Sequence, residues 1–171
     1  MVDDVVICGA ARTPMGGFQG AFSDLPASDL GGAAIKAALT QSNASPKDVA
    51  ELIMGCVLGA GQGQAPARQA GFVAGLGQEV PATTLNKMCG SGMRAAMMAT
   101  DQLALGQADV MIAGGMESMT NAPYLLPKMR GGARIGHGQV IDHMFLDGLE
   151  DAYDKGRLMG SFAEDCAEAF Q

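Results

Sequence analysis

Short apolar segments alternate with helix-forming segments along most of this chain, and this alternation constrains the fold more than any other feature. The apolar segments are rich in β-branched residues and several are closed by Gly, as is typical of buried strands. Helix starts are indicated by Ser28, a good capping residue, and by Pro66 at a first helical position. Strands separated by helices favour a parallel sheet, so we predict an α/β layer fold. Strands are expected at Asp4–Gly9, Glu51–Leu58, Thr83–Leu85 and Asp109–Ala113, and helices at Asp29–Gln41, Pro66–Leu76 and Cys89–Leu105.

The pattern changes after Ser118, where prolines and a Gly-Gly pair interrupt the sequence. We therefore expect a core domain over residues 1–119 and the start of a loop region over residues 120–171. A capping-box pattern at Ser161–Glu164 predicts a helix close to the last residue. We expect this helix to be cut short, so that the sequence is the N-terminal part of a longer protein.

Composition excludes several classes of function. The 171 residues carry 18 acidic and 11 basic groups, a net charge of −7, which disfavours nucleic-acid binding. No apolar run is long enough to span a membrane. The four cysteines are far apart and only two His are present, so we expect no metal site. Cysteines this few and this far apart, with no Cys-x-x-Cys pair, are typical of a reducing compartment, and we expect a cytoplasmic protein.

Cys89 stands at the start of a helix that is apolar nearly all round and is expected to be buried between layers. The partial positive charge of a helix N-terminus favours a thiolate there, and free N–H groups can bind an oxyanion. Gly90 and Gly92 would let a substrate approach the backbone. These features favour acyl transfer through a thioester. The other cysteines, Cys8, Cys56 and Cys166, are expected to be buried and inert.

A second interpretation uses the same residues. Gly90–Ala95 matches the pattern G-x-G-x-x-A of dinucleotide-binding helices, and Glu117 would be the acid that binds the ribose. The pattern normally follows a strong apolar strand, which residues 81–87 do not provide. The alternative function is a non-catalytic dinucleotide-binding α/β module.

The segment Leu85–Met93 resembles the acyl-enzyme signature of thiolases, with Cys89 at the position of the nucleophile. The resemblance extends along essentially the whole chain, and the later segments are most similar to acetyl-CoA acetyltransferases. The further matching segments are Val5–Ile7, Ala10–Pro14, Gly61–Ala70, Ala113–Met119, Arg130–Gly132, Asp147–Leu149 and Leu158–Gly160.

The resemblance implies a fold and a reaction. The fold would be the N-terminal half of a layered thiolase-like structure, a sheet with a buried central helix, followed by the start of a loop domain. The reaction would join two acetyl-CoA into acetoacetyl-CoA and CoA, or reverse this, through an acyl thioester on Cys89 and with no cofactor besides coenzyme A. Met159 and Leu149 would help to bind substrate. The segment Lys128–Arg134 falls where tetrameric members join dimers, which implies a homo-oligomer, a dimer of dimers.

Other parts of the family's chemistry are not found in these 171 residues. The resemblance implies a base histidine in a Gly-His-Pro motif and a second cysteine in a Cys-x-Gly-Gly motif, and neither motif occurs. His137 and His143 are expected to be solvated or to pack within a lid. Because a missing general base costs roughly 10²–10⁴-fold in rate, we expect these residues alone to show little or no turnover.

Overall fold

The computed structural model describes residues 4–171. The chain divides into two compact units, the first ending at Asn121 and the second covering Ala122–Gln171. Each unit is described by itself.

The first unit is built on a three-stranded parallel sheet in the order β2-β1-β3. The central strand β1 (Glu51–Gly55) pairs with β2 (Ala82–Leu85) and with β3 (Met111–Gly115). Three successive β1 side chains are fully buried, Leu52, Ile53 and Met54. A continuous apolar run of this kind is required when helices cover both faces of a parallel sheet. The predicted α/β fold is therefore confirmed.

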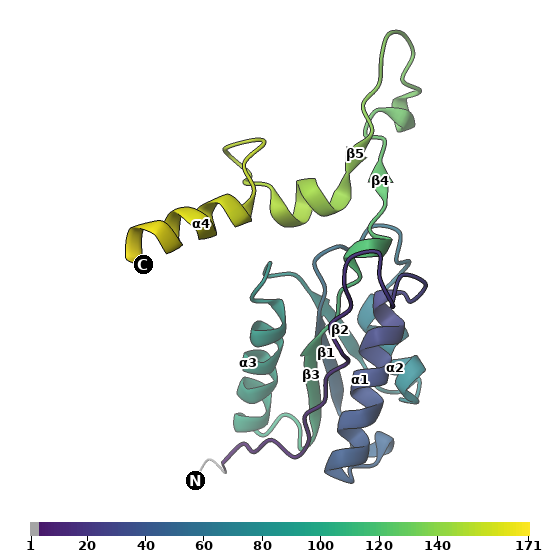
Figure 1. Cartoon of the computed structure of the whole chain (residues 1–171). Coiled ribbons are helices and arrows are strands. Elements are labelled where there is room, and N and C mark those ends of the chain that lie inside the picture. The colour runs from purple at the N-terminus through teal and green to yellow at the C-terminus, as the bar shows by residue number, and fades with distance from the viewer. Residues whose placement is uncertain (1–3) are drawn as a thin grey trace. The chain divides into compact units, whose positions relative to one another are not determined.

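Helices lie on both faces of the sheet (Figure 1). On one face α1 (Ala27–Ser42) packs closely on α2 (Pro66–Ala74), and on the other face α3 (Ser91–Ala104) packs on β1 and β3. The close α1–α2 contact depends on Gly32, where a Cβ would lie 2.6 Å from the Cβ of Val73.

The burial expected for the helix after Cys89 is only partly found. Within α3 only Ser91, Ala95 and Ala99 are buried, whereas Met93 is 74% exposed and Met97 is 51% exposed. One face of the helix contacts β1 and β3, and the exposure of Met93 and Met97 shows that the opposite face is largely uncovered by the described residues of the first unit. The expectation of burial on several sides is wrong for this unit.

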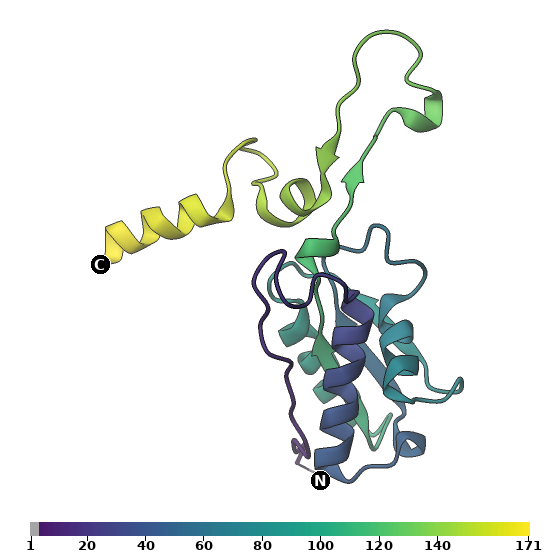
Figure 2. The same ribbon diagram turned by 45° about the vertical axis from the view of Figure 1, so that its right-hand side comes forward.

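The strand predicted at residues 4–9 is also wrong. The segment is extended and runs alongside α1 (Figures 1 and 2), but it forms no strand, and Ile7 is 88% exposed. It is attached to α1 instead, because the N–H of Ala10 donates to Oε1 of Gln41 at 3.1 Å. A β-branched run forms a strand only when a neighbouring strand supplies hydrogen-bond partners, and within the described residues none does so.

The second unit contains a short antiparallel hairpin and two helices. Strands β4 (Tyr124–Leu125) and β5 (Ile141–Asp142) pair, and a π-helical turn, Phe145–Leu149, follows. The last helix, α4 (Met159–Phe170), begins before Ser161, and no side chain caps it. The capping-box prediction is therefore wrong.

Short 3₁₀ turns occur in both units. They lie at Pro46–Asp48 and Met119–Asn121 in the first unit and at Met129–Gly131 in the second. No helix within residues 4–171 is long and apolar enough to cross a membrane.

Candidate active site

Cys89 lies in the turn that connects the end of β2 to the start of α3, at the carboxyl end of the parallel sheet. We call residues 86–90 the β2–α3 turn. Hydrogen bonds from the N–H of Gly90 to the Lys87 carbonyl (3.1 Å) and from the N–H of Ser91 to the Met88 carbonyl (3.0 Å) make it tight. Met88, directly before Cys89, has a φ of 49°. A left-handed backbone is unusual for a side chain like Met, and such strain is found at functional turns between a strand and a helix.

The hydroxyl of Ser91 fixes the shape of the turn from its helical side. It donates to the Met88 carbonyl at 2.6 Å and accepts the N–H of Lys87 at 2.9 Å. Ser91 is 5% exposed, so both bonds are shielded from water. No side chain caps α3. The first N–H groups of a helix have no acceptor within it. Those of Gly90 and Ser91 already donate to carbonyls of the turn, so the remaining N–H groups at this helix start are the ones suited to bind an oxyanion.

Asn86 fixes the turn from its strand side. Its Oδ1 accepts the N–H of Met88 at 2.9 Å, and its Nδ2 donates to the Val57 carbonyl at 3.4 Å. The orientation of the amide follows from the first bond, since a backbone N–H can only donate. Asn86 thus links the turn to the segment that follows β1.

Glycine lets α3 begin directly against the ends of β1 and β3. A Cβ on Gly55 would lie 2.5 Å from the Cβ of Ser91 and 2.8 Å from the nitrogen of Gly92. A Cβ on Gly92 would lie 3.7 Å from the backbone of Gly114, an ordinary contact. Gly92 therefore faces β3, and Gly55 is the position at which sterics demand a glycine. Sequence reasoning missed Gly55 because its neighbour is 36 residues away in the chain.

The four thiols differ in exposure. Cys89 is exposed, as a nucleophile requires, and Cys56 is buried. Cys8 and Cys166 are exposed, so their predicted burial is wrong. The reason is that Cys8 lies on the unpaired segment before α1, and Cys166 lies on α4, which has no buried residue.

Cys56 sits in an environment that favours its neutral form. Burial raises the pKa of the Cys56 thiol to about 11, and the nearby Glu117 carboxylate contributes in the same direction. Because the thiolate is the reactive species, the thiolate fraction at neutral pH falls roughly 100-fold relative to a thiol of ordinary pKa.

We expect Cys56 to be the slowest of the four cysteines to react with iodoacetamide at pH 7.5 and Cys89 the fastest. The rate at Cys56 should rise with pH until about pH 11, where its thiolate predominates. Peptide mapping by mass spectrometry over a pH series measures both rates. Labelling of Cys56 as fast as Cys89 at pH 7.5 would contradict this assignment.

The remaining predicted site residues fall into two groups. Gly90 and Gly92 lie beside Cys89 in the first unit. Leu149 ends the π-helical turn, and Met159, 42% exposed, begins α4, so both belong to the second unit. The role of these four residues in binding substrate stays a prediction.

The two histidines differ in their surroundings. His137 is exposed in the loop between β4 and β5. His143 is 6% exposed, and its Nδ1 lies 2.6 Å from Oδ2 of Asp147. His143 therefore packs within its own unit, which is one of the two roles expected for it.

Glu117 argues against the dinucleotide-binding interpretation. Both of its carboxylate oxygens accept hydrogen bonds, from the N–H of Val57 at 2.8 Å and from the N–H of Leu58 at 3.1 Å. A carboxylate engaged in this way would have to give up these bonds to hold a ribose.

Among residues 4–171, no group of three or more His, Cys, Asp or Glu side chains could hold a metal ion.

Comparison with known proteins gives a consistent result. Residues 5–171 match the family described as Thiolase, N-terminal domain. Acetyl-CoA acetyltransferase 2 of Arabidopsis thaliana is 54% identical over 169 residues, which are 98% of this chain and 41% of that protein. Acetyl-CoA acetyltransferases of Schizosaccharomyces pombe and Cupriavidus necator are 50% and 48% identical, over 96% and 98% of this chain and 42% of each relative. The chain thus spans about two fifths of the length of these relatives.

Proposed function

The chain belongs to the thiolase family, and we propose that the whole protein is an acetyl-CoA acetyltransferase whose acyl group is carried on Cys89. The observation that carries this proposal is the position of Cys89. It is an exposed thiol, held by a strained turn at the start of a helix and at the carboxyl end of a parallel sheet. The names of the relatives support the choice of acetyl-CoA as substrate.

The proposed reaction has two halves. The Cys89 thiolate attacks the carbonyl carbon of acetyl-CoA, a C–S bond to Cys89 forms, and the thiolate of coenzyme A leaves. A second acetyl-CoA then loses a proton from its methyl carbon, and that carbon attacks the acetyl group on Cys89. Acetoacetyl-CoA forms and the Cys89 thiolate is released. In the reverse direction coenzyme A cleaves acetoacetyl-CoA.

The chain would supply the nucleophile and part of its surroundings. The helix N-terminus next to Cys89 would stabilise the oxyanion that develops on the thioester carbonyl. Gly90, Gly92, Leu149 and Met159 are proposed to contact substrate. The base that removes the methyl proton would come from residues outside these 171, and no cofactor is needed besides the coenzyme A of the substrate.

Peptide mapping by mass spectrometry tests the proposal. The whole protein is incubated with acetyl-CoA, quenched in acid and mapped by peptide. The expected result is one acetyl group on the peptide that contains Cys89. Absence of an adduct, together with an NAD-dependent rise in melting temperature, would favour the dinucleotide-binding alternative.

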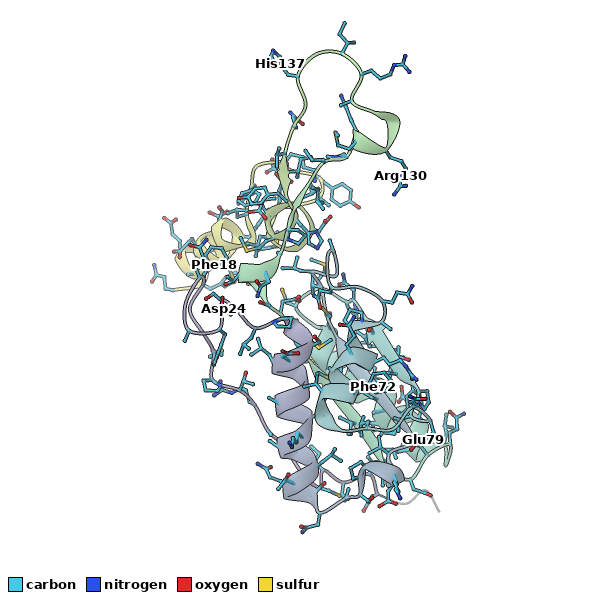
Figure 3. All side chains as sticks on the ribbon, turned by 90° about the vertical axis from the view of Figure 1, so that its right-hand side faces the viewer. Phe18, Asp24, Phe72, Glu79, Arg130 and His137 are labelled. Carbon is cyan, nitrogen blue, oxygen red and sulfur yellow. The ribbon has the colours of Figure 1, made fainter. Side chains whose placement is uncertain are left out.

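We also propose that the whole protein is a homo-oligomer, a dimer of dimers, in which residues 128–137 take part in assembly. This loop between β4 and β5 holds three basic residues and no acid, and Figure 3 shows Arg130 and His137 on it. All of it is exposed. A basic loop on an acidic chain is suited to meet an acidic surface of another subunit.

Reversing two charges, with Arg130→Glu and Arg134→Glu together, should lower the assembly state because like charges then meet at the contact. Light scattering at low and high salt measures this mass, and the effect should be larger at low salt. The matched control reverses two exposed charges of the first unit, Lys36→Glu with Lys47→Glu. An unchanged mass of the Arg130 and Arg134 variant would remove the loop from the interface.

A reducing compartment, the cytoplasm, is proposed as the location. The four cysteines all lie among the described residues, and all are free thiols. This supports the proposal because extracellular domains commonly pair such residues.

A further inference from the structure

Glu117 connects the ends of two strands at the edge of the sheet where Cys89 lies. It comes two residues after β3, and the N–H of its neighbour Met116 donates to the Gly55 carbonyl at 2.9 Å. Its Oε2 accepts the N–H of Val57, and its Oε1 accepts the N–H of Leu58 and lies 3.5 Å from the Cys56 sulfur. One partly buried carboxylate thus holds three consecutive residues after β1. Charged acceptors make the stronger class of hydrogen bonds.

The segment held by Glu117 is the one that supports the β2–α3 turn. The Val57 carbonyl accepts Nδ2 of Asn86, and Oδ1 of Asn86 accepts the N–H of Met88. Hydrogen bonds therefore run without interruption from the Glu117 carboxylate through Val57 and Asn86 to the residue directly before Cys89. Among the described residues, Glu117 forms no hydrogen bond or ion pair with Cys89 or with the turn itself.

The strained backbone of Met88 is the reason that this path of hydrogen bonds matters. A non-glycine residue keeps a left-handed backbone only when its surroundings fix that conformation. Asn86 supplies one such contact at Met88, and the other end of the Asn86 amide needs a fixed Val57 carbonyl. If the segment after β1 moved, the anchor of the turn would move with it.

We propose that Glu117 is a positioning residue for Cys89, which holds the β2–α3 turn through Val57 and Asn86. The inference rests on the proposed function, in which Cys89 is acylated. A misplacement of about 1 Å at a reacting group can cost roughly 100-fold in rate. We therefore expect Glu117→Ala to slow acylation of Cys89 roughly 10–100-fold.

The test compares two reactions of the same thiol in the whole protein. Acylation by acetyl-CoA needs Cys89 in one orientation, whereas iodoacetamide approaches an exposed thiol from many directions. We expect Glu117→Ala to slow acylation while the iodoacetamide rate at Cys89 is unchanged. Glu117→Gln keeps one acceptor for the two N–H groups and should fall between the wild type and Glu117→Ala. Glu79→Ala is the matched control, an exposed acid between α2 and β2 (Figure 3).

A double variant tests the path itself. Asn86→Ala should slow acylation as Glu117→Ala does, and the two changes together should be no slower than the slower one alone. If the fold-losses in acylation rate of the two single variants multiplied in the double variant, the two residues would act independently, and the path would be wrong.

Each result decides between the possible roles. Acylation of Glu117→Ala at the wild-type rate would overturn the inference and leave the proposed function intact. If both Glu117 variants lowered the acylation rate, the iodoacetamide rate and the melting temperature together, Glu117 would be a support of the whole fold. That result would also overturn the inference. If the wild type itself gives no acetyl adduct, the proposed function fails, and the inference fails with it.

Discussion

Cys89→Ala is expected to abolish acyl-enzyme formation and to lower turnover of the whole protein by at least about 10⁴-fold. The physical reason is that no other group in the β2–α3 turn can form the thioester. Ser91, the nearest hydroxyl in sequence, is buried and has its oxygen bound between the Met88 carbonyl and the Lys87 N–H. Steady-state rates and mass spectrometry of the acetyl-CoA-treated variant measure the two effects.

Cys8→Ala is the matched control for this variant. Cys8 is an exposed thiol of the same unit and is expected to contribute nothing to acyl transfer. A Cys89→Ala protein that retained more than a few per cent of wild-type turnover would show that another group carries the acyl chain.

Gly55→Ala is expected to produce the second largest effect, although Gly55 never meets the substrate. The new methyl group would lie 2.5 Å from the Cβ of Ser91 and 2.7 Å from its carbonyl carbon. Backbone atoms cannot rotate away, so the start of α3 must move off β1. Such overpacking costs roughly 1–3 kcal/mol of stability, and a displaced turn should lower acylation of Cys89 roughly 100-fold or more.

Thermal unfolding and the acylation rate together test this prediction. Gly17→Ala is the control, because nothing lies within 4 Å of a Cβ at that position. Wild-type stability and acylation in Gly55→Ala would mean that α3 does not need its close contact with β1.

The sequence predicted the parts of the fold that depend on local patterns. The apolar run of β1 and the glycine-flanked start of α3 are both readable in a few consecutive residues, and the structure confirms both. The segment at residues 4–9 misled the prediction because a β-branched run indicates only a tendency to extend. Whether it becomes a strand depends on a partner elsewhere in the chain.

The supports of the candidate site could not be predicted, because they join residues far apart in sequence. Nothing near Glu117 indicates that its carboxylate accepts the N–H of Val57, and the G-x-G-x-x-A pattern suggested a ribose contact instead. A Cβ built on Gly92 would lie near the backbone of Gly114, a neighbour 22 residues away that no local pattern indicates, and the role of Gly92 in binding substrate stays a prediction.

The supports of the β2–α3 turn also determine when it can form during folding. Asn86 and Val57 are separated by 29 residues, and Glu117 and Val57 by 60, so neither contact forms until long stretches of chain have been ordered. Bringing such distant segments together is entropically costly and slow compared with forming a helix. Until then only the local hydrogen bonds with Asn86 and Ser91 hold the left-handed Met88. We therefore expect the turn that presents Cys89 to become fully fixed only after β1 and β3 have paired, so that the thiol acquires its geometry at a late stage of folding.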